Sequence, residues 1–409
     1  MRKFLLLAFR NVFRNRRRTF MSLLVVAGGV AGLILVGGFF SFMFWGLQET
    51  TIQNGLGHLQ LYDAKYFDSE ETYALEHGLT DFQQIATEAA KIPHVRGVAP
   101  RIQFYGMVSN GSKSSVFMGT AVDAEQEQKM GFRTRIVKGR NLGAKSSQTN
   151  EILLGAGLAR SLNAEPGTGL TLLGVTADGA LNGIDVGVAG IVNSGFKELD
   201  DRMLRITLAD AHRMLQTDRV TNLVLGLDNT KNTEAVYLAL GPRLEGMGRK
   251  LAIRRWIDLA AYYRQVRLLF NGIFAFLGVI VFFMVVMSSA NTLMASMFER
   301  TREIGTMLAM GTPQSWLVGL FLLEAVFTGL LGAVAGVAAG SLIGAILNQS
   351  GIILPPPPGT TNGMPLKVLQ EPLLMAAASL LVMFTLALAS IMPAIRGSRL
   401  RIVEALAHV

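Results

Sequence analysis

The chain has 409 residues and a formal net charge of +9, and half of its residues are hydrophobic while only 16% are charged. This composition, with its positive mean hydropathy, excludes an ordinary soluble domain and indicates a membrane protein. The sequence contains no cysteine, which excludes disulfides, thiol catalysis and cysteine-ligated metals.

The positive charge is concentrated beside the apolar segments. Residues 1–19 hold seven basic residues and no acidic one, and the tail at 396–409 is also basic, whereas 46–268 is nearly neutral. This placement argues against a nucleic-acid partner, because the charge belongs to the flanks of membrane segments. It predicts that the N-terminus, the polar corner at 299–303 and the C-terminus all lie in the cytoplasm.

Residues 1–19 are predicted to form a cytoplasmic amphipathic helix at the membrane interface. Its basic residues fall within one narrow arc of a helical wheel, and they are Lys3, Arg10, Arg14 and Arg17. Such a helix lies among the lipid headgroups with its basic face towards anionic lipid. Plain topogenic charge would explain the number of basic residues, but it explains their arc less well.

Four apolar segments are long enough to cross a bilayer, which takes about 20 residues. They lie at 20–45, 268–298, 313–347 and 372–395. The first is too long for a signal-peptide core and lacks an obvious cleavage site, so it is interpreted as a retained anchor. An even number of spans keeps both termini on one side and places 46–267 outside, in the periplasm or its equivalent.

The exported region 46–267 mixes strand-like and helical stretches without a regular alternation, which favours an α+β fold. Strands are predicted at 102–108, 115–122, 152–154, 167–175, 184–192 and 223–227, and helices at 80–91 and 209–216. The turn Ser109–Ser112 predicts a hairpin. The predicted fold is therefore an α-helical membrane domain of four transmembrane helices with a large α+β domain inserted between the first two.

Small residues in two spans predict close helix packing. Gly28 and Gly32 lie four residues apart in the first span, and a longer series in the third comprises Gly332, Gly336, Gly340 and Gly344. We call this series the glycine seam, because such a stripe lets another helix approach closely. The neighbouring helix could come from the same chain or from a second copy.

The corner at 299–312 is predicted to be a short cytoplasmic helix followed by a tight turn. It opens with charges that can pair three residues apart, and these are Glu299, Arg300, Arg302 and Glu303. An apolar face follows, formed by Ile304, Met307 and Leu308. Gly311 is expected to end this helix, Thr312 to cap the next one and Pro313 to occupy its first turn. The element could bind a soluble partner, or it could merely turn the chain around.

Two further features have structural and functional interpretations. Glu324 lies within the third span, where a carboxylate is costly. A structural role, bonding across helices or near the cytoplasmic interface, is preferred to a proton relay because the other spans offer no ionisable partners. The external loop at 348–371 contains Pro355–Pro358, which predicts a stiff connection rather than a ligand for a proline-reading domain.

The sequence contains no motif for catalysis. The stretch at 106–114 resembles an ATP-binding loop, but Ser112 interrupts the required spacing and a hairpin is the wrong setting. The five histidines are scattered, with no metal-ligand spacing. No metal, cofactor or catalytic residue is therefore assigned to this chain.

Two stretches resemble the FtsX-like permease family. Residues 299–311 and 321–332 match its pattern E-R-x-R-E-I-G, A-x-G, F-L-x-E and G-x-x-G, and 393–406 resembles its C-terminal ending, with Ile402-Val403 in place of a proline. The resemblance implies two exported subdomains, one from 46–125 with 222–267 and a smaller one at 126–221. Segments of the exported region are similar to the lipoprotein-releasing branch.

The resemblance also implies a function. It implies the permease subunit of an ABC transporter in the bacterial inner membrane, driven by a separate ATPase dimer that binds ATP and Mg²⁺. The expected coupling residues are Glu299, Arg300, Arg302, Glu303, Ile304, Met307, Leu308 and Gly311. Further partners are a second permease copy or paralogue, a periplasmic carrier or adaptor, and membrane lipids. Lipoprotein release is the first choice. Efflux through an adaptor and outer-membrane channel, regulation of cell-wall hydrolases, and a non-transporting receptor or scaffold remain alternatives.

Overall fold

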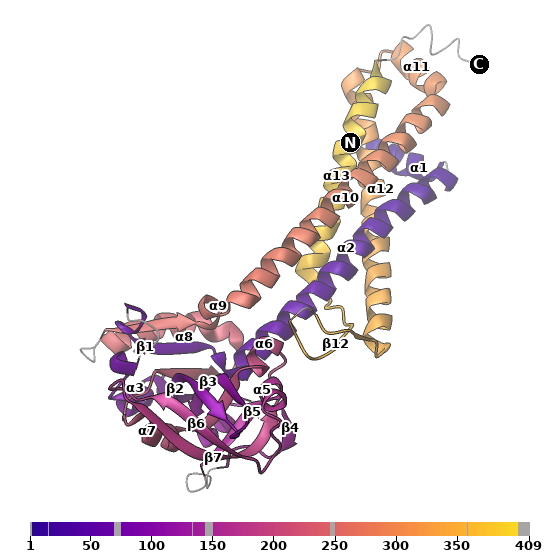
Figure 1. Ribbon diagram of the computed structural model, residues 1–409. Coiled ribbons are helices and arrows are strands. Elements are labelled where there is room, and N and C mark those ends of the chain that lie inside the picture. Colours follow the sequence, from indigo (N-terminus) through magenta and orange to yellow (C-terminus); the bar gives the residue numbers. More distant parts are fainter. Residues whose placement is uncertain are drawn as a thin grey trace. The chain divides into compact units, whose positions relative to one another are not determined.

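The computed structural model describes residues 2–14, 16–68, 75–132, 134–143, 150–245, 250–357 and 359–399 (Figure 1). The chain divides into two compact units. The helical unit comprises Met1–Trp45, Val266–Leu354 and Pro365–Val409. The sheet unit comprises Gly46–Gln265 and Pro355–Met364.

The helices that build the helical unit are α1 (Arg2–Arg14), α2 (Arg16–Thr51), α10 (Ala261–Glu299), α11 (Thr301–Ala309), α12 (Gln314–Gln349) and α13 (Pro372–Ser398). In the described part of the chain, four helical segments are long and apolar enough to cross a membrane, which confirms the predicted spans. The helix α2 continues to Thr51, beyond the predicted end at 45, and α10 begins at Ala261 rather than 268. These ends are more polar than the apolar segments between them, so hydropathy does not reveal them.

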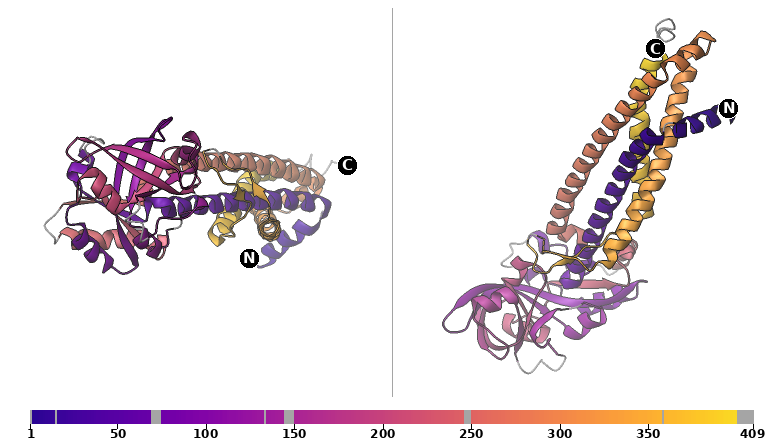
Figure 2. Two further views of the ribbon diagram at one scale, coloured as in Figure 1. Left: turned by 60° about the horizontal axis from the view of Figure 1, so that its bottom comes forward. Right: turned by 90° about the vertical axis from the view of Figure 1, so that its right-hand side faces the viewer.

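Apolar side chains from four helices form the core of the helical unit. Val30 on α2, Val285 on α10, Ala325 on α12 and Val382 on α13 are all buried in one cluster. The helix α12 runs beside α13 (Figures 1 and 2), and its glycines lie against α2. The long helices are therefore held together by apolar packing that their hydrophobic composition allows.

The sheet unit is built on one mixed sheet. Its strands are β1 (Leu59–Asp63), β2 (Val95–Ser109), β3 (Ser114–Val122), β4 (Ile136–Gly139), β5 (Glu151–Gly155), β6 (Gly169–Val175), β7 (Leu181–Val192), β8 (Met203–Thr207), β9 (Asn222–Leu227) and β10 (Leu251–Arg255). Within the described residues the order is β10-β1-β9-β2-β3-β8-β5-β7-β4, and β6 pairs with β2 and β7. The predicted hairpin is confirmed, since β2 and β3 pair antiparallel from Arg101↔Val122 to Ser109↔Ser114.

Short helices connect the strands of this sheet. They are η1 (Ile52–Leu56), η2 (Tyr66–Asp68), α3 (Phe82–Ala90), α4 (Ala124–Lys129), α5 (Ala156–Ser161), α6 (Lys197–Asp200), α7 (Leu208–Leu215), η5 (Thr230–Asn232), α8 (Thr233–Glu245) and α9 (Trp256–Leu259). Two very short strands, β11 (Ile353–Leu354) and β12 (Met364–Pro365), lie in the loop between α12 and α13. The mixture of helices and strands confirms the α+β fold class.

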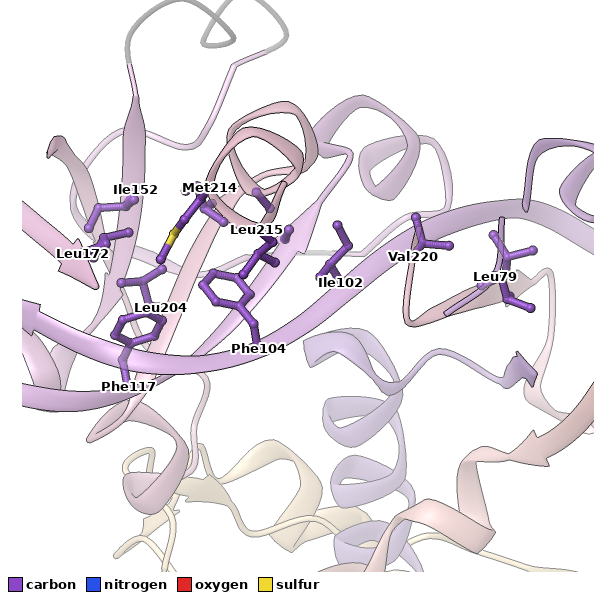
Figure 3. Packing of buried hydrophobic residues seen from close by; sticks show 14 of the residues in the cluster. Leu79, Ile102, Phe104, Phe117, Ile152, Leu172, Leu204, Met214, Leu215 and Val220 are labelled. Atoms are coloured by element: carbon purple, nitrogen blue, oxygen red, sulfur yellow. The ribbon is translucent and has the colours of Figure 1, made fainter. Parts of the chain in front are cut away.

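A continuous hydrophobic core lies along the sheet (Figure 3). Phe104 on β2 and Phe117 on β3 meet edge to face with ring centroids 5.6 Å apart. Leu204 on β8 and Met214 on α7 belong to the same cluster. Removing a ring such as that of Phe117, which is 1% exposed, would cost about 3–5 kcal/mol.

Strands from both predicted exported subdomains belong to one sheet. Strands from the predicted insertion at 126–221 continue the sheet formed by the flanking segments, because β8 pairs parallel with β3 from Met118↔Met203 to Val122↔Thr207. The insertion also shares its core with those segments. Chain boundaries alone do not reveal a pairing between strands so distant in sequence.

The external loop contributes part of its length to the sheet unit. Thr361 donates a hydrogen bond from Oγ1 to Asn193 Oδ1 at 2.8 Å, and its backbone N–H donates to the Gly195 carbonyl at 2.9 Å. Arg135 donates from Nη1 to Asn362 Oδ1 at 2.8 Å. The loop predicted at 348–371 is thus fastened to the sheet unit by its own polar residues.

Candidate coupling site in the helical unit

The short helix α11 ends in a Schellman motif that the sequence allows because Gly311 has no side chain. Gly311 adopts φ +88°, its N–H donates to the Leu308 carbonyl at 3.0 Å, and the Thr312 N–H donates to the Met307 carbonyl at 3.1 Å. The next helix is preceded by Pro313 in an extended conformation, without a side-chain cap. The expectation that Thr312 caps α12 is therefore wrong, since Pro313 occupies that position.

The apolar face of α11 is turned largely inward. Ile304 is 2% exposed and packs with Met297, Leu317 and other buried side chains, while Met307 and Leu308 are half-buried against the same cluster. Ile304 is therefore held inside the helical unit by apolar neighbours, and its expected role in coupling would be exerted through these contacts.

The exposed face of α11 and of the residues that follow it is formed by residues outside this apolar face. Arg302 and Thr306 are exposed, and Met310 is 74% exposed directly before Gly311. Sequence reasoning missed Met310. Its spacing of one turn from Thr306 and two turns from Arg302 could have predicted that it shares their exposed face, because residues three to four apart lie on one face of a helix.

Glu324 lies where three helical segments meet. Asn11 on α1 donates from Nδ2 to Glu324 Oε1 at 2.5 Å, and Arg300, which precedes α11, lies 3.2 Å from the same oxygen. The side chains of Arg300 and Glu324 are only 13% and 10% exposed. The carboxylate inside α12 is therefore bonded across helices to a cation and an amide that lie outside the apolar spans.

A second ion pair connects α1 with α11. Arg14 donates to Glu303 from both terminal guanidinium nitrogens, with Nη1 2.8 Å from Oε2, and Glu303 Oε2 also lies 3.5 Å from Arg300 Nε. The Arg14 hydrogen bond lowers the pKa of Glu303 below its ordinary value. Of the predicted i,i+3 pairs, Arg300 with Glu303 is present, but the stronger contact of Glu303 is with a residue from the other end of the chain.

The helix α1 has both a basic and an apolar exposed surface. Arg10 and Arg14 are exposed, as is Arg17 at the start of α2, so the predicted helix at 1–19 is divided between α1 and α2, whereas Ala8 and Val12 are buried. Side chains of Phe9 and Phe13 stay about half exposed, and the Phe9 ring meets Phe327 on α12 with centroids 5.7 Å apart. Such an arrangement suits a helix among lipid headgroups. The Lys3 side chain and residues 400–409 lie outside what the structure describes.

The glycine seam lies against α2 of the same chain. A Cβ on Gly332 would lie 2.4 Å from Val26, one on Gly336 would lie 2.7 Å from the Ala27 carbonyl, and one on Gly340 would lie 3.3 Å from Ala31. Gly344 instead approaches Val368 in the loop before α13. The glycines therefore let two helix backbones approach closely.

Gly28 and Gly32 lie away from this contact. Among the described residues, no atom lies within 4 Å of the Cβ that either would carry. Their neighbour Gly29 faces α10, where a Cβ would lie 3.1 Å from Val281. The structure does not bring the first glycine pair into the packing of this chain.

Two family models match the chain. The MacB-like periplasmic core domain matches residues 19–241, and the FtsX-like permease C-terminal model matches 274–402. The second match includes α11 and the whole glycine seam.

Individual relatives are distant but match over much of the chain. The lipoprotein-releasing system transmembrane protein LolE of Haemophilus influenzae is 23% identical over 66% of this chain and 65% of its own length. LolC of Neisseria meningitidis is 24% identical over 81% of this chain and 79% of its own. The macrolide export protein MacB of Psychrobacter arcticus is 23% identical over 85% of this chain and 52% of its own.

Proposed function

We propose, since the chain belongs to the family of FtsX-like permeases with a MacB-like periplasmic core domain, that it transmits the movement of a separate ATPase dimer to its extracytoplasmic domain. It is an ABC permease of the FtsX/MacB type and a multi-pass membrane protein. ATP and Mg²⁺ would be bound by the partner, because the sequence has no nucleotide-binding motif. A second permease copy or a paralogue would complete the assembly.

The observation that carries the proposal is the way α11 is fastened. It is bonded to α1 through Arg14 and Glu303, and Arg300 at its start is bonded to Glu324 on α12. Its buried side packs against Ala394 of α13 as well. A push on α11 would therefore move three other helices with it, while Met310 and Arg302 remain open to a partner.

The transmitted signal would be a shift between two arrangements of the spans. ATP can favour one arrangement only if the ATPase dimer binds it better than the other. The glycine seam lets α12 and α2 move as a closely packed pair, because few side chains separate their backbones. The helix α2 itself continues to Thr51, within the segment that belongs to the sheet unit.

The favoured activity is release of lipoproteins from the inner membrane towards a periplasmic carrier. The LolE and LolC relatives, which are named for lipoprotein release, support it by matching 66% and 81% of the chain. Efflux with a periplasmic adaptor is the second candidate, because MacB relatives include one 46% identical over 61 residues. Both candidate activities require α1, α11 and the termini to lie in the cytoplasm of a bacterium and the sheet unit to lie in the periplasm.

A purification with a matched control tests the coupling site. The tagged full chain would be purified in detergent from its own organism, and ABC ATPases that accompany it would be identified by mass spectrometry. We expect Met310→Asp to lose the ATPase, because a charge would replace the exposed apolar side chain at the docking surface. Leu238→Asp is the control, since Leu238 is 65% exposed on α8 of the sheet unit.

The outcomes separate the two levels of the proposal. An ATPase retained in equal amount by Met310→Asp would show that this surface is not the docking site. No ATPase with the unaltered chain would contradict the transporter assignment. With the ATPase in proteoliposomes, ATP-dependent release of a triacylated protein would support the lipoprotein branch, and release of a macrolide alone would support efflux.

A further inference from the structure

The sheet unit contains a cleft that the proposed function does not use. Its volume is about 780 Å³, and its lining includes Arg96, Glu127, Phe132, Thr134 and Arg205. Arg96 is exposed, whereas Arg205 and Glu127 are 8% and 6% exposed. The cleft thus has a charged, buried interior and a basic rim.

The buried charges in and beside this cleft do not balance. Glu127 accepts a hydrogen bond from Arg101 Nε at 2.8 Å and a second from Arg101 Nη2, and Arg101 is 4% exposed. Arg205 Nη1 is 3.8 Å from Glu127 Oε2, which is too long for a hydrogen bond. Two buried guanidinium groups therefore share one carboxylate: Arg101 holds it by hydrogen bonds, and Arg205 forms a longer ion pair with it, which leaves one positive charge in excess.

Arg205 instead binds neutral oxygens. It donates from Nη1 to Thr134 Oγ1 at 2.9 Å and from Nη2 to the Asn54 carbonyl at 2.8 Å. These bonds orient the guanidinium but add no negative charge to the carboxylate that it shares with Arg101, and burial lowers the pKa of Arg205. Burying two cations with only one carboxylate between them is costly, so a cleft lined by the less closely paired cation is suited to receive an anion.

We propose that this cleft binds a phosphate group, held by Arg205 in its interior and by Arg96 at its rim. Guanidinium groups bind phosphate through paired, charge-assisted hydrogen bonds, and Asn141 and Gln128 line the cleft as further donors. Apolar neighbours such as Phe132 and Leu142 would face the organic part of a phosphate ester. The phosphate could be free or part of a lipid headgroup, and this binding does not depend on the transporter assignment.

Calorimetric titration of the detergent-purified full chain at low ionic strength tests the proposal. The probes are inorganic phosphate and dihexanoyl phosphatidylglycerol below its micellar concentration. We expect saturable binding of one probe molecule per chain, no binding with Arg205→Gln, and affinity lowered about tenfold with Arg96→Gln, as for the loss of a charge-assisted hydrogen bond. Arg202→Gln is the matched control, because Arg202 is exposed near β8 and is not part of the cleft lining.

Each outcome decides the proposal. Tighter binding of the lipid probe identifies a headgroup as the source, and equal binding of both probes identifies the phosphate alone. If Arg205→Gln fails to fold, the affinity of Arg96→Gln for the probes tests the site instead, because Arg96 is exposed and its replacement should leave the fold intact. No saturable heat with either probe, or an equal loss of affinity in Arg202→Gln and Arg96→Gln, would overturn the site and leave Arg205 as a support for the Asn54 carbonyl.

Discussion

Single residues at the coupling site show how far apart in sequence its parts lie. Glu324 receives Asn11 from the first helix and Arg300 from the corner, so its charge is stabilised without an ionisable partner in another apolar span. A carboxylate with two such partners has a sufficient structural reason to be there. The same holds for Glu303, whose closest cation, Arg14, lies 289 positions away.

The Arg14–Glu303 pair predicts a dependence on pH. Because its folded pKa is lowered, Glu303 contributes stability that is fully present above its ordinary pKa of 4.5 and is lost as pH falls through the lower folded value. The side chains are 57% and 37% exposed, so screening limits the contribution at neutral pH to about 0.5 kcal/mol. The melting temperatures of the unaltered chain and of Glu303→Gln should therefore differ at pH 7, and the difference should shrink as the pH falls below 4.5 and vanish below the lowered folded pKa.

The control for this pair is a residue with a similar but unrelated contact. Glu125→Gln removes an exposed ion pair with Lys129 in the sheet unit, and it should not change how α1 is attached. If the difference caused by Glu303→Gln stays constant as the pH falls well below 4.5, the ion pair does not stabilise the helical unit.

At the scale of elements, the glycine seam makes a graded prediction. Gly336→Leu forces a side chain against the Ala27 carbonyl. It should lower the free energy of unfolding by about 1–3 kcal/mol, the usual cost of overpacking. Gly28→Leu is the matched control, because the described chain leaves open space there. The melting temperature in detergent measures both, and equal melting of the two variants would contradict the packing of α12 on α2.

The sequence allowed long periodic or strongly punctuated elements to be predicted. The four apolar spans, the β2–β3 hairpin and the Gly311 helix end all follow from local patterns. The strands β1 and β8 were missed, because four of the five residues in each are buried and the alternation of a half-buried strand is absent. The helix α8 was missed as well, and it contains Pro242, which argues against a helix.

Long-range contacts could not be predicted in the same way. Nothing near Glu324 in the sequence indicates Asn11, and nothing near Arg205 indicates that a buried arginine would line a cleft. An arginine inside a short strand even argues against burial. Such contacts depend on which segments the fold brings together, and local composition does not encode that.

At the scale of the whole molecule, one unit has the helices to cross a membrane and the other is an extracytoplasmic domain. The helical unit holds the four spans, and the sheet unit corresponds to the matched periplasmic core domain. In the proposed orientation, the basic residues at the start of the first span lie in the cytoplasm with α1, and the two crossings by α2 and α10 return the chain to the cytoplasm at α11.

Cysteine labelling tests this orientation directly, because the natural chain has no cysteine. A membrane-impermeant maleimide applied to cells with a permeabilised outer membrane should label Leu238→Cys but not Met310→Cys, and both should react once the inner membrane is opened. Both side chains are exposed, at 65% and 74%, so reactivity reports the side of the membrane rather than burial. Val285→Cys, at a position with 0% exposure, should stay unlabelled in both conditions. Labelling of Met310→Cys in closed cells would place α11 outside, where no ATPase could reach it, and would contradict the proposed transmission.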